Sequence, residues 1–138
     1  MAARLNPYIN FTGNAREALE FYRDVFGGEL RISTFGQFGQ PDSPSADQVM
    51  HGQLETPMGF TLMAADTPAE MKTVTTGNNV VICISGDDAD QLREYWTKLA
   101  ETGKVNTPLE QQVWGDVYGD LVDQFGIEWM VDIVQPRS

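Results

Sequence analysis

Apolar residues recur at helical spacing between two strand-like segments near the start of the chain. Residues 5–11 are aromatic and β-branched, as is typical of a strand, and the proline lies near its start, where a missing N–H is tolerated. Asn14 and Glu17 are spaced as a capping box, and Gly27-Gly28 provides a left-handed stop. Strand character resumes at 29–35, which predicts a β-α-β unit. The apolar stripe of its helix is Ala15, Ala18, Leu19, Tyr22 and Phe26.

Two further strands complete the first half of the chain. Residues 36–47 are rich in Gly, Pro, Ser and Asp, which predicts a loop that is either a lid or a disordered connection. A turn at 56–59 joins strands at 48–55 and 60–65 into a hairpin, so the order is β-α-β-β-β. Strict alternation in the first of these strands predicts one shared face for Val49, His51, Gln53 and Glu55.

The second half repeats this order after a polar connector at 66–78. Residues 79–85 form the most continuously apolar run of the chain, which predicts a strand buried on both faces and a buried, structural Cys83 thiol. Asp87 or Asp88 then caps a helix that ends at Gly103. Its apolar stripe is Ala89, Leu92, Trp96, Leu99 and Ala100.

Three strands follow the second helix. Pro108 places the strand at 104–110 on a sheet edge, and residues 113–122 and 127–134 form a hairpin. Trp129 and its alternate neighbours share one face of the last strand, and Trp96 and Trp129 belong to the helix–sheet core. The opposite face of that strand carries Glu128, Met130 and Asp132.

The repeated pattern predicts an α+β fold built from two βαβββ modules. Each module is too small to stand alone, so the two would pack together and pool their sheets. The chain of 138 residues is then a single domain, with modules at 4–65 and 79–135 joined by the connector. In this architecture the strands form a mixed sheet, and the helices cover one side of it.

Composition narrows the classes of function. The net charge of −11 opposes binding to nucleic acid or to anionic membranes, because phosphate neutralisation needs clustered Lys and Arg. No apolar run approaches the roughly 20 residues of a membrane span, and the N-terminus lacks the apolar core of a signal peptide, so a cytoplasmic protein is expected. A single cysteine excludes an internal disulfide and a multi-cysteine zinc site.

Several segments together resemble the PhnB-like family of the vicinal oxygen chelate superfamily, which includes glyoxalase I and the bleomycin-resistance proteins. The most specific are N-P-Y at 6–8, N-A-R-E-A-L-E-F-Y at 14–22, V-W-G at 113–115 and D-Q-F-G-I-E-W-M at 123–130. The resemblance runs over nearly the whole chain. It implies a cupped sheet with four strands from each module, helices on the convex side, a ligand in the cup and a homodimer.

The metal enzymes of this superfamily place ligands in the first and last strand of each module. Helix and turn landmarks put these positions at Pro7, Met63, Val81 and Met130. Such side chains cannot build a Mg, Mn, Zn or Fe(II) site, which needs oxygen or imidazole donors. The resemblance therefore predicts this scaffold without the usual metal or another cofactor, unless the metal site has been relocated.

Some members of the family carry a methyltransferase name, which this sequence does not support. Phe26-Gly27-Gly28 is a helix stop, and no glycine-rich strand-to-helix loop for a nucleotide cofactor is present. A phosphate-cradling loop and a G-x-S-x-G turn are also missing from the sequence.

His51 is the only histidine, and alternation places it beside Gln53 and Glu55. If this face lines the cup, His51 would bind a ligand group or act as a general base oriented by Glu55. The alternative is a half-exposed strand histidine without chemistry. Trp114 would supply an aromatic wall, or else close a loop or a dimer contact.

The centre of the cup is apolar in this interpretation. Met63 and Met130 would either contact a ligand or fill the space entirely. Glu128 and Asp132 flank Met130 and would supply carboxylates to the cavity, or else lie solvated at a strand end.

The leading hypothesis is a metal-independent protein that binds an apolar or aromatic small molecule. Its ligand-binding residues would be His51, Gln53, Met63, Trp114, Glu128 and Met130. The alternative is a divergent metal-dependent isomerase, lyase or dioxygenase with a site built from His51, Glu55, Glu128 or Asp132. A third hypothesis, suggested by the acidic surface, is a non-catalytic dimer that interacts with proteins. The sequence leaves open whether any reaction is catalysed.

Overall fold

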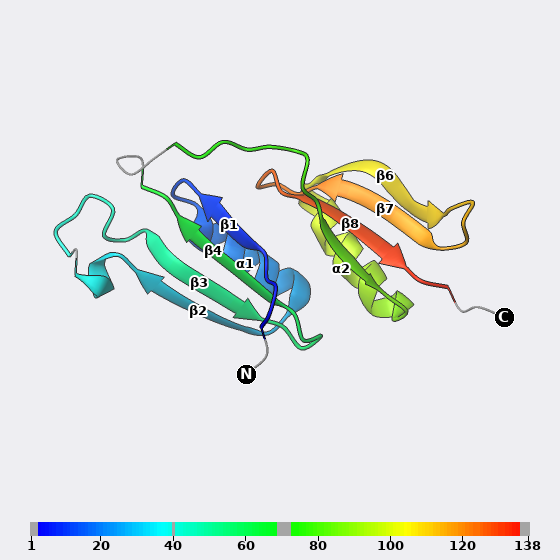
Figure 1. Ribbon diagram of the computed structural model, residues 1–138, viewed down its shortest axis with the longest axis horizontal. Coiled ribbons are helices and arrows are strands. Elements are labelled where there is room, and N and C mark those ends of the chain that lie inside the picture. The colour runs from blue at the N-terminus through cyan, green and yellow to red at the C-terminus, as the bar shows by residue number, and fades with distance from the viewer. Residues whose placement is uncertain (1–2, 40, 69–72, 136–138) are drawn as a thin grey trace. The chain divides into compact units, whose positions relative to one another are not determined.

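The computed structural model describes residues 3–39, 41–68 and 73–135. The chain divides into two compact units, Met1–Thr75 and Thr76–Ser138. In each unit, one helix packs against one face of a four-stranded mixed sheet (Figure 1). The predicted α+β fold of two βαβββ modules is therefore confirmed. No helix within these residues is long and apolar enough to cross a membrane.

The first unit has five main elements and one short 3₁₀ helix. They are β1 (Tyr8–Phe11), α1 (Ala15–Phe26), β2 (Glu29–Thr34), η1 (Gly36–Phe38), β3 (Val49–Glu55) and β4 (Thr61–Asp66). The strand order is β1-β4-β3-β2, with β1 parallel to β4 and the other pairs antiparallel. The two ends of the predicted loop at 36–47 are joined by a hydrogen bond from the Gly36 N–H to the Ala46 carbonyl, 2.9 Å.

Helix α1 packs against β3 and β4 through the predicted apolar stripe, all of which is buried. Gly52 lets α1 approach the sheet closely, because a Cβ atom at that position would overlap the Cδ1 atom of Leu19. Gly27 ends the helix at φ 75°, a conformation that glycine adopts without strain. The sequence therefore predicted both the buried face and the end of α1 correctly.

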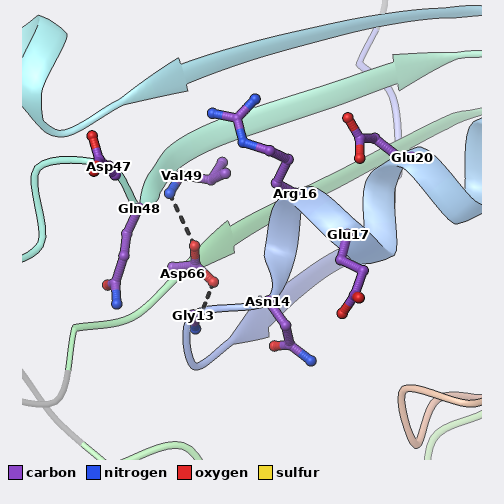
Figure 2. Close-up of a pocket in the computed structure, with 9 residues that line it drawn as sticks. All are labelled: Gly13, Asn14, Arg16, Glu17, Glu20, Asp47, Gln48, Val49 and Asp66. Atoms are coloured by element: carbon purple, nitrogen blue, oxygen red, sulfur yellow. Dashed lines mark hydrogen bonds between the residues drawn. The ribbon is translucent and has the colours of Figure 1, made fainter.

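The start of α1 is held by Asp66, not by Asn14. The Asn14 side chain makes no capping hydrogen bond. Oδ1 of Asp66, at the end of β4, accepts hydrogen bonds from the backbone N–H groups of Gly13 (2.8 Å, drawn in Figure 2) and Ala15 (3.0 Å). The predicted capping box at Asn14 and Glu17 is therefore wrong. A buried carboxylate from a distant strand, which binds the N–H groups on either side of Asn14, holds the helix start instead.

The same carboxylate fixes the start of β3. Oδ2 of Asp66 accepts a hydrogen bond of 2.9 Å from the Val49 N–H, as Figure 2 shows. The pairing of β2 with β3 is irregular here, since Ser33 pairs with His51 and Thr34 with Val49. Val49 is buried while His51 is half-buried. The prediction that Val49 shares a face with His51 is wrong, because this β-bulge breaks the alternation.

The second unit repeats the topology. Its elements are β5 (Ile82–Gly86), α2 (Ala89–Thr102), β6 (Lys104–Gln111), β7 (Val117–Val122) and β8 (Glu128–Ile133). The strand order is β5-β8-β7-β6, with β5 parallel to β8, so β6 lies at an edge as Pro108 predicted. Asp88 caps α2, with its Oδ1 accepting a hydrogen bond of 3.2 Å from the Gln91 N–H.

Strand β5 is not buried on both faces. Ile82 and Ile84 are half-buried, whereas Cys83 and Ser85 are exposed. The prediction of a buried Cys83 thiol is therefore wrong. The physical reason is that β5 is an edge strand with α2 packed on one of its faces, so its alternate side chains face away from the helix.

Trp129 is the centre of the second core, as predicted. Its side chain is fully buried, and its Nε1–H donates a hydrogen bond of 2.8 Å to Oδ2 of Asp123. Oδ1 of the same carboxylate accepts from the N–H groups of Phe125 (2.8 Å) and Ile127 (3.1 Å), which shapes the β7–β8 turn. Trp96 is half-buried and lies against Gly119, where there is no side chain to displace it.

Replacing Asp66 by Asn should destabilise the protein by about 2 kcal/mol. An amide has one acceptor oxygen, so either the Val49 N–H or the pair at the helix start would face an NH₂ group. Chemical denaturation measures the change. Asp47→Asn, the same substitution at an exposed neighbour, is the matched control and should have almost no effect. Equal stability of the two variants would contradict the role assigned to Asp66.

Replacing Gly52 by Ala should cost about 1–3 kcal/mol by overpacking the contact with α1. Gly86→Ala is the control, because a Cβ atom there would lie at an ordinary 3.8 Å from Leu92 Cδ1. Thermal unfolding of the two variants tests the difference. A combined Leu19→Ala and Gly52→Ala variant should lose less stability than the sum of the single changes, and strict additivity would argue against the close contact.

Candidate functional site

Each sheet has one face packed against its helix and one face without a helix, which we call its open face. In the first unit, Gly52 and the side chains of Leu54, Leu62 and Ala64 are buried on the helix side. The alternate residues therefore lie on the open face. The strand register places Tyr8, Met63, Gln53 and Arg31 in one row across all four strands of this face.

His51 lies on the same open face, between Tyr8 and Gln53. Its Nδ1 atom is 3.4 Å from the Tyr8 hydroxyl, and its Nε2 atom is 3.4 Å from Oε1 of Gln53. The rings of Tyr8 and His51 are 5.7 Å apart between centroids and tilted by 35°. The phenol is 48% exposed, and burial of the rest of the side chain raises the pKa of Tyr8, so it stays protonated at neutral pH.

Of the predicted site residues, the structure brings His51, Gln53 and Met63 together. The side chain of His51 contacts Gln53 and Tyr8, whereas Glu55, the predicted orienting group, pairs with Glu29 and Thr61 further along the strands. The sequence analysis missed Tyr8 as a site residue. The N-P-Y motif identified this segment, but its strand pattern alone did not say which neighbour of His51 would lie within reach.

The four positions implied for a metal do not present metal-binding side chains in this fold. Pro7 and Val81 each directly precede a first strand. The residues aligned with Met63 and Met130 are Tyr8 and Cys83. A phenol, a thiol and two thioethers do not fit a hard divalent cation. In residues 3–39, 41–68 and 73–135, no three His, Cys, Asp or Glu side chains are grouped to hold a metal ion.

The open face of the second sheet carries Glu128, Met130 and Asp132, which alternate with three buried residues of β8. Asp132 pairs with Tyr118 in β7 and with Ser85 in β5. The face is therefore more acidic than its counterpart in the first unit.

The hydroxyl group of Tyr118, on this face, is fixed by a hydrogen bond. Its hydroxyl donates a hydrogen bond of 2.7 Å to Oδ2 of Asp120. Burial, this hydrogen bond and the nearby negative charge together raise the pKa of Tyr118 to about 12. Tyr118 therefore remains a hydrogen-bond donor throughout the physiological pH range.

Asp132 and Asp116 form a carboxyl pair next to Tyr118. Burial, followed by the charge of Asp116 and a hydrogen bond to it, raises the pKa of Asp132. Burial and Asp132 also raise the pKa of Cys83, so this exposed thiol is not activated as a nucleophile.

Trp114 and Glu128 occupy different places in the second unit. Trp114 lies in the β6–β7 turn, 62% exposed, with its ring edge-on to Tyr118 at 6.0 Å between centroids. Glu128 lines an open hollow of about 550 Å³ together with Asn78 and Val122. One oxygen of its carboxylate, Oε2, is buried and has no hydrogen-bond partner among the described residues.

A second hollow, of about 520 Å³, lies beside the start of α1 (Figure 2). Its rim carries the exposed side chains of Arg16, Glu17 and Glu20, and its floor includes Asp66. The sequence analysis did not identify this hollow, because it depends on β3 and β4 converging on the helix start. The Asp66 carboxylate already occupies the N–H groups there.

Comparison with proteins of known sequence identifies relatives along the whole chain. Protein YjdN of Escherichia coli is 24% identical over 145 residues, covering 96% of this chain and 97% of YjdN. Protein Rv0887c of Mycobacterium tuberculosis is 32% identical over 133 residues, covering 91% of this chain and 71% of the relative.

Solved structures share the fold. Protein PA1353 from Pseudomonas aeruginosa superposes with a TM-score of 0.85 at 31% identity, over 98% of this chain and 100% of that one. A PhnB protein from Bacillus cereus gives a TM-score of 0.74 at 21% identity, over 96% and 100%. A glyoxalase/bleomycin resistance protein/dioxygenase family enzyme from Burkholderia phytofirmans gives 0.62 at 15% identity, over 93% and 97%.

The family assignment follows from these matches and from the fold. The family model described as 3-demethylubiquinone-9 3-methyltransferase matches residues 3–132, and the paired βαβββ units agree with it. The resemblance found in the sequence is thereby confirmed. The chain belongs to the 3-demethylubiquinone-9 3-methyltransferase family and shares the fold of the PhnB and glyoxalase/bleomycin-resistance structures.

Proposed function

We propose that this protein binds a small organic molecule with an apolar or aromatic part, without a metal ion, on the open face of the first sheet. The observation that carries the proposal is the row in which Tyr8 lies next to Met63, beside the polar pair His51 and Gln53. An aromatic ring and a thioether offer an adaptable apolar contact. Imidazole and amide groups next to them would fix the orientation of a ligand.

The open face of the second unit supports binding of the same class of ligand, but its polar group is a carboxylate where the first unit has an imidazole and an amide. Met130 lies at its centre, Glu128 presents a carboxylate, and the exposed Trp114 extends from the adjacent turn. Within the second unit, these three residues are the ligand-binding residues that we propose. The homodimer implied by the family resemblance remains part of the prediction.

Methyl transfer is not part of the proposal, although the family's name includes it. The β1–α1 connection has one glycine, Gly13, and not a glycine-rich loop. The N–H groups of Gly13 and Ala15, which such a loop would offer to an anionic cofactor group, already donate to Asp66.

Binding can be detected at the methionine methyl groups. Titrating 4-nitrophenol, an aromatic probe, into protein labelled with ¹³C in its methionine methyls should shift the Met63 signal. The signal of Met58, which is exposed in the β3–β4 turn, is the internal control. The shift should persist in the presence of EDTA. An unchanged Met63 signal, or a shift abolished by EDTA, would contradict metal-independent binding on this face.

The contribution of Tyr8 to binding can be measured separately. Tyr8→Ala should weaken 4-nitrophenol binding about tenfold, because an aromatic contact worth roughly 1.4 kcal/mol is lost. Phe38→Ala removes another exposed ring of the same unit and serves as the matched control. Equal affinity of the Tyr8 variant and the unaltered protein would place the ligand elsewhere.

A further inference from the structure

Both ring nitrogens of His51 face an oxygen atom of a neighbouring side chain. Nδ1 faces the Tyr8 hydroxyl and Nε2 faces Oε1 of Gln53, each at 3.4 Å. These distances are long for hydrogen bonds, as is common before a ligand closes a site. The three side chains come from two strands, and their order is phenol, imidazole, amide.

Which of these atoms can donate a hydrogen bond, and which can only accept one, determines where the hydrogen atoms lie. The amide oxygen of Gln53 only accepts, so the nitrogen facing it, Nε2, carries the hydrogen of the neutral imidazole. Nδ1 is then unprotonated and accepts from the Tyr8 hydroxyl, which keeps its proton at neutral pH. The imidazole lone pair is thus directed at a phenol that is itself 48% exposed.

We propose that Tyr8, His51 and Gln53 form a proton relay that removes the proton from an acidic hydroxyl, such as a phenol or an enol, of a ligand on the open face of the first sheet. The inference rests on the proposed binding function and adds a chemical activity to it. Tyr8 is the catalytic residue because its oxygen meets the ligand. His51 and Gln53 are positioning residues that act through it.

The transfer is balanced without a metal, an oxidant or a reductant. The ligand O–H bond breaks, its proton forms a new O–H bond at the Tyr8 oxygen, and the original Tyr8 proton moves to Nδ1 of His51. The electron pair stays on the ligand oxygen as a phenolate or enolate. His51 becomes an imidazolium whose Nε2–H donates to the Gln53 carbonyl. Return of the proton restores the relay.

The surroundings of the relay suit an anionic product with an apolar body. Met63 lies beside Tyr8, and Arg31 lies beyond Gln53 in the same row. Arg31 is paired with Glu29 at 3.0 Å, but both side chains are largely exposed. Because an exposed ion pair contributes little stability, the guanidinium can turn to a ligand oxyanion at small cost.

The resting arrangement can be observed directly, because His51 is the only histidine. In protein labelled with ¹⁵N-histidine, the single imidazole should show the neutral form protonated at Nε2. Tyr8→Phe should reduce this preference, since it removes the group that bonds to Nδ1. Tyr118→Phe, which removes a phenol from the second unit, should leave the spectrum unchanged. A form protonated mainly at Nδ1, or no effect of Tyr8→Phe, would overturn the relay.

Ionisation of the bound probe tests the activity. One pH unit below the pKa of free 4-nitrophenol, the ratio of phenolate to phenol should rise about tenfold on binding, read from the phenolate absorbance. Tyr8→Phe and His51→Gln should abolish the rise, and Tyr118→Phe should retain it. Binding at Met63 without ionisation would overturn the relay and leave the proposed function intact. Absence of any Met63 shift would contradict the proposed function itself.

Discussion

The buried carboxylate of Asp66 joins three parts of the first unit that are distant in sequence. It ends β4, accepts two N–H groups at the start of α1, and accepts a third at the start of β3. A buried carboxylate is costly unless it is fully hydrogen-bonded, and these donors would themselves be costly to leave unpaired. The helix start and the two central strands are therefore stabilised together, and each depends on the position of the others.

The position of His51 in the candidate site depends on these hydrogen bonds of Asp66. By holding the Val49 N–H, Asp66 fixes the start of β3 next to the bulge at which Ser33 pairs with His51 and Thr34 with Val49. A bulge changes which face the following residues occupy, so the pairing after it determines that His51 lies on the open face. There the imidazole meets Tyr8 and Gln53. The Asp66 carboxylate, on the helix side of the sheet, thus determines where the His51 imidazole lies on the open face.

The two open faces differ in chemistry, although the two sheets have the same strand topology. The first combines a phenol, an imidazole and an amide around a methionine, and the second combines carboxyl groups and a thiol around a methionine. Met63 and Met130 lie at the centres of the two faces, and their thioethers do not suit a hard metal ion. What remains is hydrogen bonding and proton transfer by side chains, which is the basis of the function and the relay proposed above.

The sequence by itself determined the elements, their order and the family. The spacing of Ala15–Phe26, the glycine stop and the alternation around Trp129 are local patterns, and each was confirmed because helix and strand periodicity depend on neighbouring residues. The alternation that places His51 and Gln53 on one face of their strand also agrees with the structure. Asn14 and Cys83 were assigned wrongly, and Tyr8 was missed, because capping by Asp66, the uncovered edge strand β5 and the contact across β4 are long-range. Only the tertiary structure decided these, since they bring together residues whose separation in the chain carries no periodic signal.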